Sequence, residues 1–166
     1  MPIEFLDLFK SFGDKHVLKG VTMRVERGEI LFVIGTSGVG KSVTIKHIIG
    51  LLTPTRGVLR VDGVEVQDFT EKQFLPIRKK VAMVFQASSL FDSLSVVGNV
   101  MLPLRKHMRM GSGKAREKAM SLLREVGMDR QAETSPAQIG DGMRKRVAIA
   151  RALAMDPDYV LFDEPT

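Results

Sequence analysis

The chain has 166 residues, 44% of them hydrophobic and 27% charged, which is an ordinary globular composition. Apolar runs fall short of the roughly 18 residues that a membrane helix needs, the acidic start MPIEFLDLFK excludes a signal peptide, and the absence of cysteine excludes disulfides and thiolate metal sites. The formal net charge of +6 is compatible with nucleic acid, an anionic membrane surface or a nucleotide as partner.

The first part of the chain is predicted to consist mainly of strands. Residues 4–12 and 17–25 are short, β-rich and interrupted by polar residues, and residues 57–67 alternate around Asp62-Gly63, a strong two-residue hairpin signal. Residues 29–35, EILFVIG, form a continuous apolar run of the kind that is buried on both faces of a sheet. We therefore expect a buried strand at 29–35 beside an antiparallel β portion.

Helices and further strands follow. Apolar spacing predicts a helix over 112–126, with Ser112 as its N-cap and Gly127 as its C-cap. The other predicted elements are helices over 42–51 and 143–155 and buried strands at KVAMVF (80–85) and YVLF (159–162). This order predicts an α/β architecture with an antiparallel β portion at the start and a helical insertion in the middle.

The motif GTSGVGKS lies where a predicted strand meets a predicted helix. It matches G-x-x-x-x-G-K-[ST], in which small residues let successive backbone N–H groups surround phosphates at a helix N-terminus. Lys41 supplies a point charge to the outer phosphates and Ser42 a hydroxyl to Mg²⁺. The alternative is an ordinary glycine-rich turn. The predicted phosphate-binding residues are Gly35, Thr36, Ser37, Gly38, Val39, Gly40, Lys41, Ser42 and Val43.

An acidic pair, Asp163 and Glu164, follows the last predicted strand. Ligands of open α/β sheets bind beyond the carboxyl ends of the strands, so we expect both carboxylates near the phosphate loop. Asp163 would orient Mg²⁺ or its waters, and Glu164 would act as general base on the attacking water. Taken by itself, such a pair is more often a solvated strand end.

Four segments in order, GTSGVGKS, VFQ, QIGDGMRKRVAIARAL and LFDEPT, resemble the ATPase subunits of ABC transporters over nearly the whole chain. Residues 87–104 and 142–166 look most like the Mla-type ATPases of lipid transport. The resemblance implies a P-loop NTPase with a RecA-like ABC ATPase core, ATP and Mg²⁺ as cofactors, a second ATPase subunit and an integral-membrane permease as partners, and a place on the cytoplasmic face of the membrane. It divides a single partial domain, 1–166, into a β portion with the P-loop core (1–86), a helical subdomain with the signature helix (87–155) and the Walker B strand (156–166).

The resemblance also assigns roles to individual residues. Phe12 matches the aromatic residue that stacks on adenine, although a hydrophobic plug is the alternative. Gln86 matches the glutamine that senses Mg²⁺ and the attacking water. The predicted catalytic residues are Glu164, Gln86 and Lys41, and the predicted metal ligands are Ser42, Gln86 and Asp163.

The signature motif departs from the family pattern L-S-G-G-Q or L-S-G-G-M. It spans Ile139, Gly140, Asp141, Gly142 and Met143, so that Gly140 and Asp141 replace the serine and the first glycine. With a dielectric of about 20, two unit charges about 5 Å apart repel by roughly 3 kcal/mol, which exceeds the helix-terminus attraction of about 0.3–1 kcal/mol. We therefore expect the chain to complete a partner's nucleotide site poorly; alternatively, Asp141 caps its own helix.

The end of the sequence and a basic cluster leave further functions open. Family members continue past this point to a strand ending in a switch histidine, so we expect a domain that is incomplete at the C-terminus and unstable in isolation. The cluster of Arg105, Lys106, Arg109, Lys114, Arg116 and Lys118 indicates a solvated face, or else a contact with anionic lipid or a partner loop. Besides a transport ATPase, the alternatives are a regulatory module that binds nucleotide without efficient hydrolysis and an ABC protein acting on nucleic acid, although no nucleic-acid motif is present.

Overall fold

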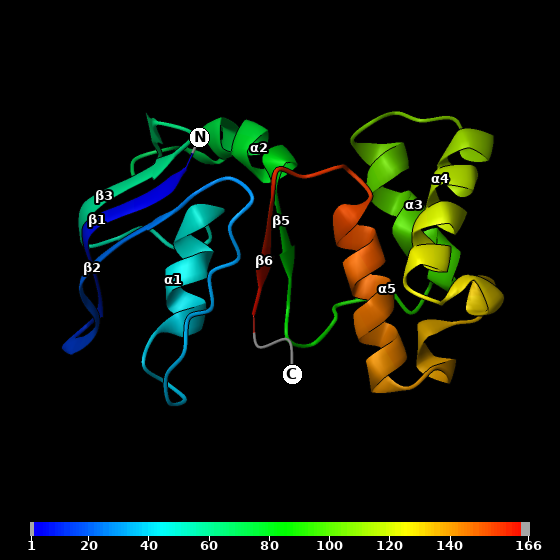
Figure 1. Ribbon diagram of the computed structural model, residues 1–166, viewed down its shortest axis with the longest axis horizontal. Coiled ribbons are helices and arrows are strands. Elements are labelled where there is room, and N and C mark those ends of the chain that lie inside the picture. Colours follow the sequence, from blue (N-terminus) through cyan, green and yellow to red (C-terminus); the bar gives the residue numbers. More distant parts are fainter. Residues whose placement is uncertain (1, 164–166) are drawn as a thin grey trace. The chain divides into compact units, whose positions relative to one another are not determined.

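The computed structural model describes residues 2–163, which form two compact units with a boundary between Val81 and Ala82. The first unit holds an antiparallel sheet of four strands in the order β2-β1-β3-β4 (Figure 1). Its strands are β1 (Ile3–Phe12), β2 (Lys15–Val25), β3 (Arg56–Val61) and β4 (Val64–Glu65), and its helices are α1 (Lys41–Ile48) and α2 (Glu71–Lys80).

The predicted antiparallel β portion and the hairpin at Asp62-Gly63 are confirmed. Strands β1 and β2 pair antiparallel from Ile3 opposite Val25 to Phe12 opposite Lys15. The two-residue turn between β3 and β4 has Asp62 at φ 53° and Gly63 at φ 79°, which is the left-handed pair that a type I′ hairpin requires. The core side of this sheet consists of fully buried apolar residues: Phe5, Leu8, Leu59 and Val61.

The predicted buried strand at 29–35 is wrong. These residues are in no strand, and Ile30, Phe32 and Ile34 are 80%, 79% and 91% exposed. An apolar run becomes a strand only where a neighbour supplies ladder hydrogen bonds, and no strand within residues 2–163 pairs with this one. The apolar composition of residues 29–35 suits a buried strand, but composition does not say which strand would pair with it.

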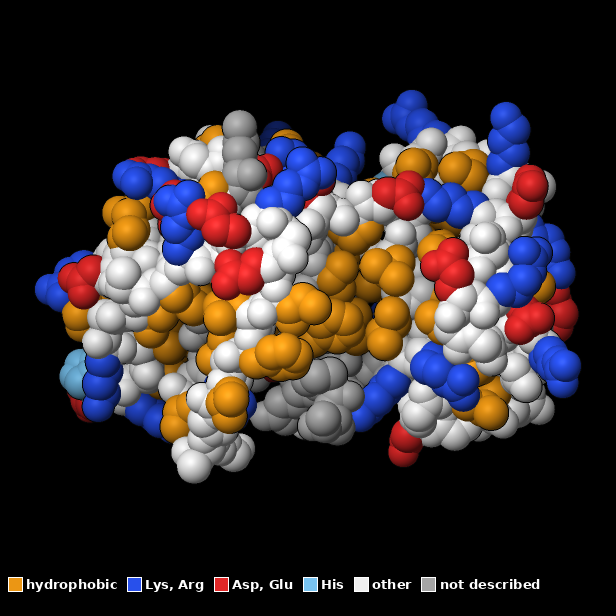
Figure 2. All heavy atoms as spheres, in the orientation of Figure 1, with side chains coloured by type: hydrophobic (Ala, Val, Ile, Leu, Met, Phe, Trp, Pro, Cys, Tyr) orange, Lys and Arg blue, Asp and Glu red, His pale blue; other side chains and the backbone are white. Residues whose placement is uncertain are grey.

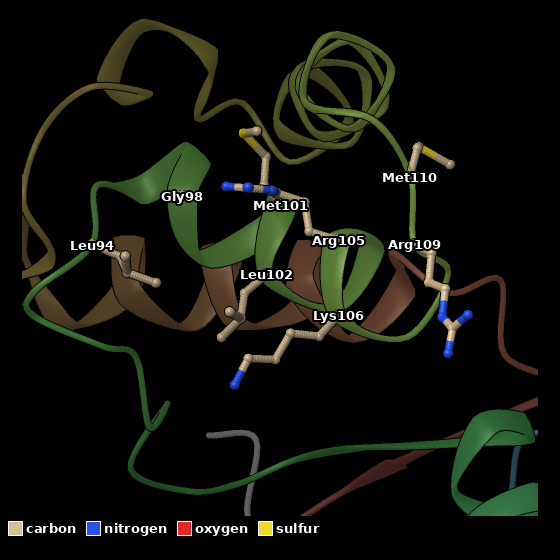
Figure 3. A pocket seen from close by; sticks show the side chains of 8 residues that line it. All are labelled: Leu94, Gly98, Met101, Leu102, Arg105, Lys106, Arg109 and Met110. Atoms are coloured by element: carbon tan, nitrogen blue, oxygen red, sulfur yellow. The ribbon is translucent and has the colours of Figure 1, made fainter.

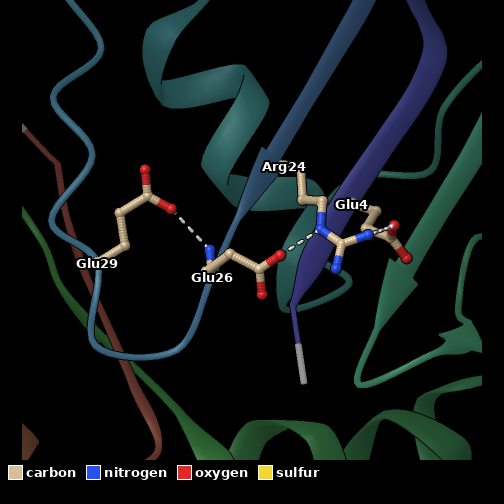
Figure 4. A network of polar contacts seen from close by, with 4 residues as sticks. All are labelled: Glu4, Arg24, Glu26 and Glu29. Carbon is tan, nitrogen blue, oxygen red and sulfur yellow. Dashed lines mark hydrogen bonds and ion pairs between the residues drawn. The ribbon is translucent and has the colours of Figure 1, made fainter.

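The turn that leads into this run is held by polar contacts (Figure 4). Arg24, near the end of β2, donates from Nη1 to Glu4 of β1 at 3.0 Å and from Nε to Glu26 at 2.5 Å. The amide of Glu26 donates to the carboxylate of Glu29 at 2.7 Å. The end of the sheet and the start of the exposed run are thereby fastened together.

The second unit combines a two-stranded sheet with a helical cluster. Its elements are β5 (Val81–Val84, whose first residue closes the first unit), α3 (Val96–Lys106), α4 (Ser112–Glu125), the 3-10 turns η1 (Asp129–Gln131) and η2 (Pro136–Gln138), α5 (Asp141–Leu153) and β6 (Tyr159–Phe162). Strands β5 and β6 are neighbours and run in the same direction (Figure 1). The YVLF strand is therefore confirmed, but its predicted burial is wrong, because Phe162 is 43% exposed and the other three residues are half-buried.

The helical cluster has its own apolar core. Helices α3, α4 and α5 contribute fully buried residues that include Val100, Leu104, Leu123 and Val147. Gly127 closes α4 in the left-handed conformation, φ 66°, as predicted, and the amide of Met128 reaches back to the Leu123 carbonyl at 2.7 Å. Ser112, predicted as the N-cap of α4, is instead its first residue and follows the cap Gly111.

Two helices, α2 and α3, were not predicted. The sequence signal for α2 is its capping box, in which Thr70 and Gln73 satisfy each other's backbone N–H groups. Pro76 inside α2 and Pro103 inside α3 obscured both helices. No helix within residues 2–163 combines the length and the apolar character that crossing a membrane requires.

Candidate functional site

The glycine-rich loop precedes α1 in the first unit, as its motif predicts. Residues 35–39 are exposed, and α1 begins at Lys41 after the N-cap Gly40. The Lys41 ammonium lies back over the loop and donates to the carbonyls of Gly35 at 2.8 Å and Thr36 at 2.9 Å. The lysine thus reaches from the end of the loop back to its first two residues, and an incoming phosphate would offer its ammonium better acceptors than neutral carbonyls.

Gly40 fixes where this loop ends. Its φ of +107° is strained for any other residue, and a Cβ at this position would lie 2.8 Å from Leu18 Cδ2 and 3.0 Å from Val17 Cγ1 of β2. The first turn of α1 therefore packs directly against β2. Glycine is required at this position both for the turn and for the close approach.

Phe12, the predicted adenine-stacking residue, lies at the end of β1 and is 46% exposed. Phe12 pairs with Lys15 of β2. Lys15 lies two residues before Val17, whose side chain is next to Gly40. The Lys10 ammonium lies 5.0 Å from the centre of the Phe12 ring. The aromatic face is accessible on the same hairpin that supports the loop.

The opposite end of α1 is anchored by α2. Arg78 donates from Nε to the Ile49 carbonyl at 2.8 Å and is oriented by an ion pair with Glu71 at 2.7 Å. This satisfies a carbonyl at the helix C-terminus, where a cation is favourable. The sequence alone gives no sign of this contact, since the two residues are 29 positions apart.

His47 is fully buried in α1, with 1% of its surface exposed. Its Nδ1 lies 2.6 Å from the Val43 carbonyl and therefore carries the proton, since a carbonyl only accepts. Its Nε2 has no hydrogen-bond partner among the described residues. Burial is the main cause that lowers the pKa of His47 below its ordinary value of 6.5.

Gln86 and Asp163 belong to the second unit and lie at the same end of the β5–β6 pair. The Asp163 amide donates to the Val84 carbonyl at 3.0 Å, and Asp163 is 9% exposed. Glu164, the predicted general base, lies outside the described residues. Mg²⁺ prefers oxygen ligands, and the three candidates are the Ser42 hydroxyl, the side-chain carbonyl of Gln86 and the Asp163 carboxylate. Ser42 belongs to the first unit.

The loop after Gln86 is held by two residues that the sequence did not single out. Arg151 of α5 donates to the carbonyls of Ser88 at 3.1 Å and Ser89 at 2.9 Å, and both serines are in the left-handed conformation. Buried Asn99 of α3 exchanges hydrogen bonds with both backbone groups of Phe91, at 2.8 and 3.0 Å. Burial lowers the pKa of the Arg151 guanidinium. No local pattern marks an arginine within a helix as a loop anchor.

The signature segment forms the start of α5. Ile139 is buried, Gly140 is the N-cap, and Asp141 is the first helical residue. The alternative that Asp141 caps its own helix is wrong, because the N-cap is Gly140 and the Asp141 carboxylate forms an ion pair with Arg144, one turn along. The Asp141 side chain is 86% exposed. Gly142 is exposed and Met143 half-buried.

The Asp141–Arg144 pair changes the electrostatics expected at this helix start. In bulk water, unit charges about 4 Å apart interact by about 1 kcal/mol, compared with the roughly 3 kcal/mol obtained above with a dielectric of about 20. The adjacent guanidinium offsets part of that repulsion. The Asp141 carboxylate therefore opposes a nearby anion less than an unpaired carboxylate would.

The sequence is similar to a known protein family and to several of its members over nearly the whole chain. The family model described as ABC transporter matches residues 18–166. A glutamate/aspartate import ATP-binding protein of Escherichia coli (strain K12) is 42% identical over 164 residues, 99% of this chain and 68% of that protein. A probable ribonucleotide transport ATP-binding protein of Mycobacterium leprae is 39% identical over 163 residues, which are 98% of this chain but only 47% of that protein. The chain thus spans about half of that relative's length.

Solved structures of ATP-binding cassettes have the same fold as this chain. The dimeric ATP-binding cassette MJ0796, in a post-hydrolysis state bound to ADP and Pi, matches with a TM-score of 0.90 and 32% identity over 99% of this chain and 74% of that one. CbiO1 from Clostridium perfringens, part of the ABC transporter complex cbiONQ, matches with a TM-score of 0.88 and 30% identity over 99% of this chain and 65% of that one. By both sequence and fold, the chain belongs to the ABC transporter family.

Proposed function

We propose that the chain is the ATP-binding part of an ABC transporter and that it binds MgATP and hydrolyses it to drive a membrane permease. The observation that carries this proposal is the loop of residues 35–40, whose first two carbonyls accept hydrogen bonds from the Lys41 ammonium and which leads directly into the N-terminus of α1. A helix N-terminus with adjacent small residues is suited to hold a chain of phosphates.

The residues of this site would have separate roles in binding and hydrolysis. Amides of the loop and the Lys41 ammonium would hold the phosphates, and Phe12 would stack on the adenine. Mg²⁺, when bound, would neutralise phosphate charge and orient the oxygens of the γ-phosphate. Ser42 and Asp163 would hold it, and Gln86 would position the attacking water, with Glu164 as general base.

A second subunit would complete the nucleotide site. The signature segment, 139–143, would approach the nucleotide bound by a paired ATPase subunit, and the MJ0796 cassette to which this chain is similar is dimeric. A permease would dock from the membrane, and the chain would then lie at the cytoplasmic face of that membrane. No contact with nucleic acid is proposed.

The cargo we propose is lipid. Its support is the resemblance of residues 87–104 and 142–166 to the lipid-transport ATPases. The relatives described above are named for other cargoes, ribonucleotides in one case and glutamate and aspartate in the other. Co-purification with a permease and transport assays with labelled phospholipid and labelled glutamate would separate these assignments.

Calorimetry tests the nucleotide site. The purified chain should take up ATP only with magnesium, and Lys41→Ala should weaken uptake roughly 10- to 100-fold, since a charge-assisted hydrogen bond contributes about 1.5–3 kcal/mol. Lys72→Ala, at an exposed position of α2, is the matched control and should leave affinity unchanged. Equal uptake by both variants would contradict the proposed site.

The competing function is a regulatory module that binds ATP without efficient turnover. The observation that favours it is the carboxylate of Asp141 in the signature segment. If the chain, assembled with its permease, binds MgATP as predicted but releases no phosphate, and if Asp141→Gly with Gly140→Ser restores release, the regulatory function replaces the transport ATPase.

A further inference from the structure

Lys10 of β1 connects the exposed ring of Phe12 to the segment that follows α1. Its ammonium lies 5.0 Å from the centre of the Phe12 ring and donates to the Thr53 carbonyl at 2.6 Å. Thr53 follows α1, which ends at Ile48 and begins with the phosphate loop's lysine. One cation thus contacts both the aromatic ring and the backbone beyond the helix that carries the phosphate loop.

The backbone around Lys10 is held by other contacts. The Thr55 amide donates to the Phe9 carbonyl at 2.8 Å, and the Ser11 amide donates to the Thr55 hydroxyl at 3.0 Å. Across the hairpin, the Ser11 hydroxyl and Nδ1 of His16 lie 2.8 Å apart. The end of β1 is therefore fixed independently of the Lys10 side chain, whose ammonium is left to act on the ring.

The Phe12 ring remains accessible beside this cation. Phe12 is 46% exposed although Lys10 lies over its ring. Residues 12–16 are all exposed, and basic and histidine side chains lie at this end of the first unit (Figure 2). A planar base can therefore stack on the ring surface that Lys10 leaves open.

A base would find a poorer stacking surface in the cavity along α3. This cavity has a volume of about 570 Å³ and is lined by residues of α3 and of the loops on either side of it (Figure 3). None of the eight described residues that line it is aromatic. The exposed ring on β1 is the better partner for a base.

We propose that Lys10 is a positioning residue for the nucleotide base: it orients the Phe12 ring and draws electron density toward itself, so that the open side of the ring stacks more strongly on an electron-rich purine. This role rests on the proposed function, in which Phe12 stacks on adenine. A cation is attracted by the quadrupole of a ring face, and the hydrogen bond to Thr53 keeps the ammonium there. Because the ring is ordered before the nucleotide arrives, binding costs less side-chain entropy.

Calorimetry on single and double variants tests this role. Lys10→Met keeps the apolar stem and removes the charge, and it should weaken MgATP binding about three- to fivefold, which corresponds to about 0.6–1 kcal/mol. Lys10→Arg keeps a cation and should restore most of the affinity. Phe12→Leu should itself weaken binding roughly 5- to 150-fold through the lost stack, and Lys10→Met should add nothing in that background. Lys19→Met removes the same charge from an exposed position of β2 and, as the matched control, should bind like the wild type.

Inorganic tripolyphosphate separates this role from a purely structural one. It carries no base, so with magnesium it should bind the wild type and Lys10→Met equally. Equal losses of ATP and tripolyphosphate binding in Lys10→Met, or an effect of Lys10→Met that persists in the Phe12→Leu background, would each overturn the proposal. Unchanged ATP affinity in Phe12→Leu would overturn it together with the adenine-stacking role, yet it would leave the phosphate site intact, which the Lys41→Ala variant tests separately.

Discussion

Gly40 offers a sharp test of how the nucleotide loop is built. Gly40→Ala adds one carbon at a place where the nearest side-chain carbons of β2 lie 2.8 and 3.0 Å away, inside normal van der Waals contact. The backbone there is also left-handed, φ +107°. The substitution therefore combines backbone strain of about 1–2 kcal/mol with overpacking of about 1–3 kcal/mol.

Gly38 provides a matched control within the same loop. Its φ is +82°, but a Cβ at this position would meet nothing within 4 Å. Gly38→Ala therefore carries only the backbone strain of about 1–2 kcal/mol. The difference between the two variants isolates the contact between the loop and β2.

Thermal unfolding and calorimetry measure the two consequences. For a chain of this size, each 1 kcal/mol lowers the melting temperature by about 2–4 °C, so Gly40→Ala should melt roughly 4–20 °C below the wild type and Gly38→Ala about 2–8 °C below it. ATP uptake should be lost in Gly40→Ala, because relieving the contact moves the N-terminus of α1. Equal melting temperatures for the two variants would refute the packing of the loop end against β2.

Three further predictions follow from other contacts. Arg151→Ala should destabilise the chain by about 1–3 kcal/mol and speed hydrogen exchange of the 88–91 amides, whereas Arg124→Ala, on the exposed side of α4, should do neither. Because burial lowers the pKa of His47, the free energy of unfolding should fall as pH drops from 6.5 toward the folded-state pKa, and His47→Gln should flatten that slope in a pH series of melts. Asp141→Asn should raise phosphate release no more than roughly fivefold, since its exposed, paired charge opposes phosphate by about 1 kcal/mol; a much larger gain would show that Arg144 does not offset it.

Local chemistry explains what the sequence predicts well. The hairpin at Asp62-Gly63, the closing glycine at 127 and the junction of loop and helix at Lys41 each depend on a few adjacent residues whose backbone preferences agree. These features were predicted within a residue or two. They include the element that carries the proposed function.

What escaped prediction depends on partners distant in the chain. The run 29–35 has the composition of a buried strand, yet burial requires a neighbour that composition does not specify. The anchors Arg78 and Arg151 reach carbonyls 29 and 62 or 63 positions away. Arginine on a helix surface is ordinary, so only the fold distinguishes an anchor from a solvated side chain.

Helix α5 links two parts of the proposed machinery within the second unit. Asp141 begins the helix at the signature segment, and Arg151, ten residues later, holds the loop that follows Gln86. At 1.5 Å per residue the two positions are about 15 Å apart along one rigid helix. A shift of the signature end in response to a partner's nucleotide would therefore move the loop by its carbonyls at Ser88 and Ser89. Loosening that anchor should lower turnover at saturating ATP and leave the affinity for ATP intact, because the phosphates are held by the loop before α1.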